Sequence, residues 1–90
     1  MKLRYTERAL DEIDKAVEYI GARSPQGAES VARRIREVLT VLELQPYAGA
    51  RAYRKTRRFI LKPYPYAVIY TIRSGEIVVL RFRHTARNKQ

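Results

Sequence analysis

The side chains best suited to chemistry gather in the last predicted strand and in the tail that follows it. Residues 77–90, IVVLRFRHTARNKQ, begin as an apolar strand and then carry Arg81, Arg83, the only histidine (His84) and Arg87. Guanidinium groups stabilise negative charge that develops on a phosphate, and an imidazole can move protons near neutral pH. The segment is therefore compatible with a catalytic clamp on a phosphate, a docking surface for an acidic partner, or a solvated tail.

The two faces of this strand follow from the alternation of side chains along extended backbone. One set is Val78, Leu80, Phe82 and His84, and the other is Ile77, Val79, Arg81 and Arg83. We expect the first set to face the predicted helices, which leaves Arg81 and Arg83 on the open face of the sheet. His84 then points away from the two arginines, and a backbone-bonded or partly buried imidazole is its simplest role.

Further basic residues are expected close to the same open face. Arg57 and Arg58 are neighbours on an earlier strand, so one of them shares that face. Lys62 closes that strand, and Tyr70 lies nearby on the middle strand. The candidate target-binding residues, which would bind phosphate in a nuclease, are Arg57, Arg58, Lys62, Tyr70, Arg81, Arg83, His84 and Arg87.

The net charge of +10 comes entirely from the second half of the chain. Residues 1–46 hold 8 Lys/Arg and 8 Asp/Glu, whereas residues 47–90 hold 11 Lys/Arg and a single acid, Glu76. A field of this kind steers anionic molecules toward the protein. Nucleic acid, the ribosome and an acidic protein are all compatible partners.

The composition argues against several other kinds of chemistry. The chain has no cysteine, which removes disulfides and thiolates, and its single histidine argues against a transition-metal site. It has no glycine-rich phosphate loop, so we expect no metal and no cofactor. It also has no apolar run of transmembrane length and no secretory signal at its start. We therefore expect no membrane contact and a cytoplasmic location.

Two helices are predicted in the first half of the chain. Thr6 is a plausible N-cap for an amphipathic helix that is expected to stop at Gly21. Ser24 can cap a second, longer helix, because Pro25 suits its first turn. This helix is expected to end before Pro46, and the short link between the two helices predicts an antiparallel hairpin.

Strands account for most of the remaining sequence, since β-branched and aromatic residues are concentrated there. The expected strands are KLRY (2–5), TRRFILK (56–62), YAVIYTI (66–72) and IVVLRFR (77–83). A loop is expected at residues 46–55, and the segments PYP and RSGE separate the last three strands as a meander. The sequence thus predicts one domain over residues 1–90. Its fold class is α+β, a helical hairpin packed on a small antiparallel sheet in the order β-α-α-β-β-β.

Several segments of the chain match the pattern of a known protein family. They are YTERALDEIDKAVEYI, LELQPYAG, RRF and, most specifically, PYAVIY, SGEI and VLRFRHTAR. With these segments the chain resembles the RelE/ParE superfamily of bacterial toxins, and the ParE branch in particular. ParE-like members run from a Pro–aromatic pair through a tyrosine into a strand that ends in His-x-x-Arg. The matching positions here are Pro65, Tyr66, Tyr70, His84 and Arg87.

This resemblance implies a bacterial cytoplasmic toxin that a cognate ParD-like antitoxin holds inactive in a hetero-oligomer. ParE-like toxins trap DNA gyrase on cleaved DNA, which implies a gyrase poison without an active site of its own. RelE-like relatives instead cut mRNA in the ribosome and use a tyrosine or histidine near the C-terminus, so a ribosome-dependent mRNA endonuclease is the alternative. No tyrosine follows Tyr70, which favours the non-enzymatic branch. A plain nucleic-acid-binding module is a third hypothesis.

Overall fold

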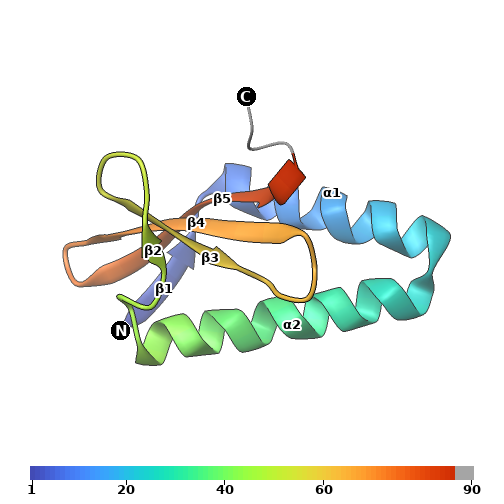
Figure 1. Ribbon diagram of the computed structural model, residues 1–90, viewed down its shortest axis with the longest axis horizontal. Helices are drawn as coiled ribbons and strands as arrows, with labels where there is room; N and C mark the ends of the chain where they lie inside the picture. Colours follow the sequence, from blue (N-terminus) through green and yellow to red (C-terminus); the bar gives the residue numbers. More distant parts are fainter. Residues whose placement is uncertain (87–90) are drawn as a thin grey trace.

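Two long helices and a twisted five-stranded sheet make up the fold in the computed structural model, which describes residues 1–86 (Figure 1). The elements are β1 (Lys2–Tyr5), α1 (Glu7–Arg23), α2 (Pro25–Leu44), β2 (Ala50–Arg51), β3 (Thr56–Ile60), β4 (Tyr66–Arg73) and β5 (Glu76–His84). The predicted α+β class and the order β-α-α-β-β-β are confirmed. The short strand β2 is an addition, because it lies inside the predicted loop at 46–55.

Side-chain caps determine where both helices begin. Thr6 Oγ1 accepts a hydrogen bond from the Ala9 N–H at 3.0 Å, and Ser24 Oγ accepts one from the Gly27 N–H at 3.0 Å. Each bond satisfies an N–H group that has no partner within its own helix. Pro25 lies in the first turn of α2, where a missing N–H costs nothing. The predicted caps are therefore confirmed.

The prediction that α1 stops at Gly21 is wrong, because the helix continues to Arg23. The Ser24 N–H donates to the Ile20 carbonyl at 2.8 Å, so one serine ends α1 and begins α2. A Cβ atom on Gly21 would lie 3.4 Å from the Cβ of Ala28. A Cβ atom would therefore meet only an ordinary van der Waals contact, and this glycine lies inside the helix without terminating it.

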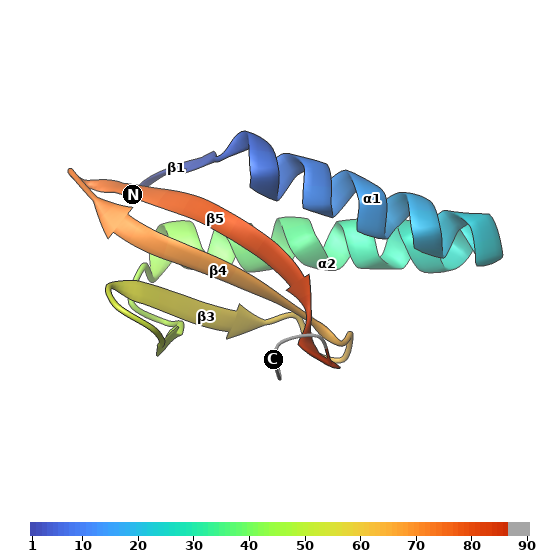
Figure 2. The ribbon, with the colours of Figure 1, turned by 90° about the horizontal axis from the view of Figure 1, so that it is seen from above.

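The sheet has the strand order β1-β5-β4-β3-β2, and both helices lie on the same side of it (Figure 2). β1 pairs parallel with β5, while the other neighbours pair antiparallel, so the sheet is mixed and not purely antiparallel as predicted. The hydrophobic core lies between the hairpin and the sheet. Its largest fully buried members in that cluster are Tyr70, Leu42, Leu61, Ile77 and Val38.

A bulge in β5 changes which side chains of this strand reach the core. Tyr70 pairs with Val79, but the preceding residue Ile69 pairs with Arg81. Leu80 is therefore an extra residue in the ladder. An extra residue of this kind bends the strand and shifts the alternation of its side chains by one position.

The predicted alternation along β5 is therefore wrong in the first half of the strand. Ile77 and Val79 join Phe82 in the core cluster that packs against the helices. Val78 is buried but lies outside that cluster, and Leu80 lines a cleft on the opposite face. Side chains alternate regularly between the two faces only where the strands pair regularly, and Leu80 interrupts that pairing.

Candidate functional site

A cleft of about 660 Å³ opens on the sheet face that the helices leave uncovered. We call it the arginine cleft, and its lining residues are Ala52, Tyr53, Arg54, Thr56, Arg58, Ile69, Leu80, Arg81, Arg83 and Thr85. Within residues 1–86, this lining holds four guanidinium groups and no carboxylate. Clustered guanidinium groups attract phosphates and carboxylates and can bind them in a bidentate manner. The charge of the lining is therefore complementary to that of an anionic partner.

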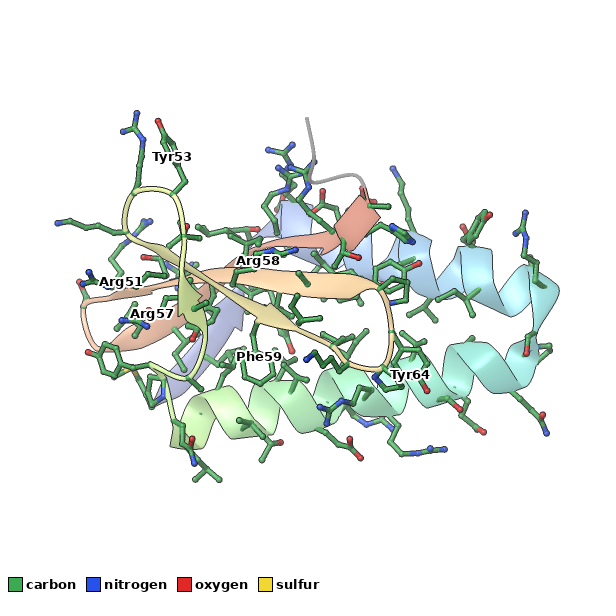
Figure 3. The ribbon with its side chains drawn as sticks, viewed as in Figure 1. Arg51, Tyr53, Arg57, Arg58, Phe59 and Tyr64 are labelled. Atoms are coloured by element: carbon green, nitrogen blue, oxygen red, sulfur yellow. The ribbon has the colours of Figure 1, made fainter. Side chains whose placement is uncertain are left out.

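One wall of the arginine cleft is the loop between β2 and β3. The Thr56 hydroxyl donates to the Tyr53 carbonyl at 2.6 Å, and the Ala52 N–H donates to the Thr56 carbonyl at 3.0 Å. Arg54 occupies the left-handed region, with φ 58°, at the turn of this loop. The Tyr53 side chain is 77% exposed and points away from the body of the protein at the tip of the loop (Figure 3).

Tyr53 and Arg54 are the site residues that sequence reasoning missed. They lie within the stretch that was predicted as an undifferentiated loop. The position of the loop over the open face depends on the pairing of β2 with β3 and on a bond from Thr71 Oγ1 to the Lys55 carbonyl at 2.9 Å. Local sequence carries no signal for that distant contact.

The structure separates the two neighbouring arginines of β3, as alternation predicted. Arg58 is paired with Ile69 and lines the arginine cleft. Arg57 lies on the helix side, where its Nη1 donates to the Tyr47 carbonyl at 3.2 Å and to the Gly49 carbonyl at 2.9 Å. Arg57 therefore holds the segment after α2 in place and is not part of the cleft.

Lys62 also lies apart from the arginine cleft. Its backbone carbonyl accepts a hydrogen bond from Arg34 Nε of α2 at 2.9 Å. Its side chain is exposed and does not appear in the lining of the cleft. The structure therefore does not bring Lys62 together with Arg58 and Arg83, contrary to the predicted grouping.

The prediction that Tyr70 lies beside the arginines on the open face is wrong. Its side chain is completely buried in the core, where its hydroxyl donates to the Pro46 carbonyl at 2.7 Å and accepts from the Gly49 N–H at 2.8 Å. Burial raises the pKa of Tyr70, although the Gly49 bond and the charge of Arg57 oppose the change. A Cβ atom on Gly49 would lie 2.6 Å from the Tyr70 hydroxyl, so the close approach requires glycine there. Tyr70 thus anchors the end of α2 from within the core.

Arg81 is held in place by a carboxylate on α1. Its Nη2 lies 2.7 Å from Glu12 Oε2, and its Nε lies 3.1 and 3.0 Å from the two oxygens of Glu12. The Phe82 N–H also donates to Glu12 Oε1, at 2.9 Å. These bonds connect α1 to the outer edge of β5. Arg81 therefore stabilises the fold and also lines the cleft.

The charge of Glu12 is stabilised by the same contacts. Burial alone would raise the pKa of Glu12, but the hydrogen bonds from Arg81 and Phe82 and the nearby positive charges outweigh it. The pKa is consequently held below its usual range. Glu12 is therefore ionised at neutral pH and serves as the counter-ion of Arg81.

His84 lies on the other side of β5 from the arginine cleft. Its Nδ1 accepts a hydrogen bond from the Ala86 N–H at 3.1 Å, and its ring meets Tyr66 edge-on with centroids 5.2 Å apart. The imidazole is thus backbone-bonded and partly buried, the simple role predicted for it. With Nδ1 as the acceptor, a neutral His84 carries its proton on Nε2.

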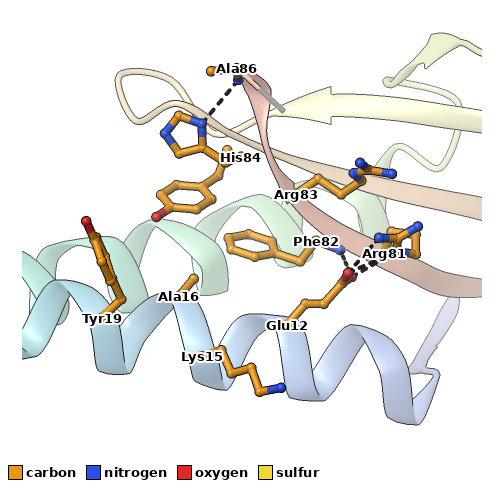
Figure 4. Close-up of a pocket in the computed structure, with 10 residues that line it drawn as sticks. Glu12, Lys15, Ala16, Tyr19, Arg81, Phe82, Arg83, His84 and Ala86 are labelled. Atoms are coloured by element: carbon orange, nitrogen blue, oxygen red, sulfur yellow. Dashed lines mark hydrogen bonds and ion pairs between the residues drawn. The ribbon is translucent and has the colours of Figure 1, made fainter. Parts of the chain in front are cut away.

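A second hollow, the α1–β5 groove, separates the first helix from the end of β5 (Figure 4). Its volume is about 600 Å³. The groove is lined by Glu12, Lys15, Ala16, Tyr19, Tyr66, Arg81, Phe82, Arg83, His84 and Ala86. Arg81 and Arg83 line both the groove and the arginine cleft. The two hollows are therefore neighbours on either side of the same strand.

The remaining predictions concern Arg87, metals and membranes. Arg87 lies outside the described residues. Within residues 1–86, no group of three or more His, Cys, Asp or Glu side chains is arranged to hold a metal ion. Among these residues, no helix has the length and apolar character that crossing a membrane would require.

Comparison with known proteins connects this architecture to one family. Residues 3–89 match the model of the ParE toxin of the type II toxin–antitoxin system, parDE. Toxin RelE2 of Caulobacter vibrioides is 32% identical over 83 residues, which cover 92% of this chain and 93% of the relative. Putative toxin Y4kP of Sinorhizobium fredii is 32% identical over 84 residues, which cover 92% and 86%.

Solved structures confirm the fold. The chromosomal ParDE TA system from P. aeruginosa matches with a TM-score of 0.82 and 22% identity, over 93% of this chain and 95% of that one. A YoeB/ParE toxin from Agrobacterium tumefaciens matches with a TM-score of 0.66 and 16% identity, over 93% and 98%. At these identities the structural likeness concerns the fold alone. From the family match and the two relatives, this chain belongs to the ParE toxin family of type II toxin–antitoxin systems.

Proposed function

We propose that this toxin arrests growth by trapping DNA gyrase on cleaved DNA and that a ParD-like antitoxin neutralises it. The observation that carries the proposal is the composition of the arginine cleft. Four guanidinium groups line it, and no imidazole or carboxylate does so within the described part of the chain. Such a lining favours docking to an anionic surface over catalysis, because proton transfer near neutral pH requires a group that titrates there.

The positions of the predicted proton-transfer groups support docking as well. His84 lines the α1–β5 groove, where its Nδ1 accepts from the Ala86 backbone. Tyr70 is buried with both sides of its hydroxyl bonded to backbone. Neither side chain lines the arginine cleft. The cleft residues are therefore better suited to hold the target than to cleave it.

A second candidate function is that of a ribosome-dependent mRNA endonuclease. One observation favours it: the exposed phenol of Tyr53 lies at the rim of the arginine cleft beside Arg54. A phenol that is placed next to guanidinium groups can exchange a proton with a reacting hydroxyl. One relative also bears the name Toxin RelE2.

The antitoxin is the expected partner in a hetero-oligomer in the bacterial cytoplasm. The toxin carries a net charge of +10, so an acidic antitoxin segment would be attracted to it and would associate rapidly. Such segments are commonly disordered when free and become ordered on binding. The family model and the fold of the ParDE structure support this pairing.

A supercoiling assay tests the gyrase proposal. Purified gyrase, ATP, relaxed plasmid and the antitoxin-free toxin are incubated together, and both supercoiled and linear plasmid are measured after detergent and protease treatment. We expect toxin-dependent loss of supercoiling and accumulation of linear plasmid. Normal gyrase activity beside a toxin that still arrests growth would contradict the proposal. Cleavage of mRNA in purified translating ribosomes would then establish the second candidate.

A further inference from the structure

The floor of the arginine cleft combines positive charge with apolar surface. Arg58, Ile69 and Arg81 are paired in one row across β3, β4 and β5. Residues paired in this way share a face of the sheet, and two strand spacings separate the Cα atoms of Arg58 and Arg81 by roughly 10 Å. Ile69 lies between them, and both it and the bulged Leu80 are only partly buried. A complementary ligand therefore offers separated negative charges together with an apolar surface.

The rim of the cleft adds an aromatic ring to this charge. Tyr53 is 77% exposed at the tip of the β2–β3 loop, and the guanidinium carbon of Arg54 lies 5.1 Å from the centre of its ring (Figure 3). The backbone of Tyr53 is held in place, because its carbonyl accepts from the Thr56 hydroxyl at 2.6 Å and from the Thr56 N–H at 3.3 Å. An exposed ring beside guanidinium groups is typical of proteins that bind single-stranded nucleic acid, where cations follow the backbone and bases stack on aromatic faces.

The shape and composition of the cleft favour a nucleic acid strand over an acidic protein surface. A strand alternates regularly between a phosphate and a flat base, which matches neighbouring guanidinium groups and an aromatic ring, whereas an acidic protein surface has no such repeat. The volume of about 660 Å³ is that of a small-ligand pocket. The cleft can therefore enclose a short stretch of a single strand but not a double helix.

We propose that the arginine cleft binds a single strand of DNA directly, with phosphates on its guanidinium groups, a sugar against Ile69 and Leu80, and a base stacked on Tyr53. In a toxin that traps gyrase on cleaved DNA, this contact attaches the toxin to a DNA strand at the break. That consequence rests on the function proposed above, whereas affinity for the strand itself follows from the lining alone. The Tyr53 hydroxyl has no part in this contact, in contrast to the proton transfer that it would perform in a nuclease.

Binding of DNA in the absence of gyrase tests the inference. The antitoxin-free toxin is titrated into a fluorescent DNA strand of about 12 nucleotides, and anisotropy is followed at several salt concentrations. An RNA strand and a DNA duplex of the same sequence are compared in parallel. Thermal unfolding of every variant shows whether its fold is retained.

The chain offers a matched control for each cleft residue. Arg58→Gln removes a cleft charge and Arg58→Lys retains it, while Arg36→Gln removes an exposed charge on α2 outside the cleft. Tyr53→Ala removes the ring and Tyr53→Phe removes only its hydroxyl. Tyr47→Ala is the control for the ring, because Tyr47 is also exposed and lies 5.1 Å from the guanidinium carbon of Arg57 but does not line the cleft.

We expect Arg58→Gln to make the dependence of log affinity on log salt less steep by about 0.7, the value for one phosphate contact of a single strand. Arg58→Lys should keep the parental slope. Tyr53→Ala should weaken binding by about 10-fold at an unchanged slope, because stacking releases no counterions, and Tyr53→Phe should bind like the parent. Arg36→Gln and Tyr47→Ala should also stay close to the parent.

Equal slopes in Arg58→Gln and Arg36→Gln would show that DNA meets the overall charge of the protein, which would overturn the assignment to the cleft. Tighter binding of RNA or of the duplex would overturn the choice of ligand. A parent that did not bind the strand but still produced linear plasmid with gyrase would overturn direct DNA contact and leave the proposed function, with an acidic surface of gyrase in the cleft. Binding of the strand without any effect on gyrase would contradict the proposed function and leave the cleft assignment intact.

Discussion

At the scale of single residues, Glu12 has the most consequential role. It receives two hydrogen-bonding partners from β5, the guanidinium group of Arg81 and the N–H of Phe82. Both bonds join positions about seventy residues apart in sequence, so Glu12 connects the first helix to the last strand. It also lines the α1–β5 groove. One carboxylate thus fixes the shape of the groove and the position of a cleft arginine.

Replacing Glu12 with glutamine should lower the free energy of unfolding at pH 7 by about 1–3 kcal/mol, because a charge-assisted pair becomes a neutral one. The folded-state pKa of Glu12 is depressed, so its contribution is complete above the unfolded value of about 4.3 and is lost as pH falls through the folded value. The difference between parent and variant should therefore shrink below about pH 4. Urea unfolding at pH 7 and pH 3 measures it.

The matched control for this variant is Asp11→Asn. Asp11 forms an exposed pair with Lys15 at 3.1 Å, so its loss should change the free energy of unfolding by less than about 1 kcal/mol. A Glu12→Gln variant as stable as the parent at pH 7, or one whose deficit persists unchanged at pH 3, would show that the pair with Arg81 adds no stability.

At the scale of elements, the β2–β3 loop allows target binding to be changed with little effect on the stability of the fold. Arg54 lies in the left-handed region, with φ 58°, and lines the arginine cleft. Arg54→Gly should change the free energy of unfolding by less than about 1 kcal/mol, because glycine adopts this conformation without strain. It should nevertheless reduce the yield of gyrase-cleaved plasmid, since a guanidinium group leaves the cleft. Thermal unfolding and the plasmid assay together measure both effects.

Ser74 provides a control for Arg54 with the same backbone conformation. It has φ 52° in the turn between β4 and β5, and it is not part of the arginine cleft. Ser74→Gly should match Arg54→Gly in stability and match the parent in plasmid cleavage. If both glycine variants gave as much gyrase-cleaved plasmid as the parent, Arg54 would have no part in target binding.

The helices and most strands were predictable because their signals are local. Capping by Thr6 and Ser24, apolar periodicity along both helices and clusters of β-branched residues all act within a few positions of the chain. The prediction that the first helix ends at Gly21 was wrong because glycine is common just after a helix end but also occurs inside helices. The end of α1 is instead determined by Ser24, whose N–H donates to the Ile20 carbonyl and whose side chain caps α2.

The site was less predictable because its geometry depends on pairing between strands. The bulge at Leu80 inverts the faces of β5, and no residue within the strand signals it. Adjacent residues of the middle strand β4 are buried in pairs, Ala67 with Val68 and Tyr70 with Thr71, so alternation could not indicate which face Tyr70 occupies. Alternation predicted that only one of Arg57 and Arg58 lies on the open face, and only the structure shows that it is Arg58. The sequence alone does not distinguish Glu12 from its exposed neighbours, because its contacts with β5 exist only in the folded protein.

At the scale of the whole molecule, the segregated charge should govern the rate of association. The excess of +10 lies in residues 47–90, which include both walls of the arginine cleft and the end of β5. We expect the association rate constant with the antitoxin to fall roughly 10-fold or more between about 0.05 and 0.5 M salt, while the dissociation rate changes much less. Stopped-flow mixing or surface plasmon resonance over that range measures both constants. An association rate that did not depend on salt would contradict electrostatic steering.

The most direct test of a docking toxin compares three variants in the purified gyrase assay. Arg58→Glu reverses a charge inside the arginine cleft, Arg36→Glu reverses one outside it, and His84→Ala removes the only imidazole. We predict that Arg58→Glu raises the toxin concentration needed for linear plasmid by about 10-fold or more, while Arg36→Glu and His84→Ala remain near the parent. A His84→Ala loss of about 10²–10⁴-fold, the scale of a general acid–base group, with Arg58→Glu unaffected, would contradict docking through the cleft.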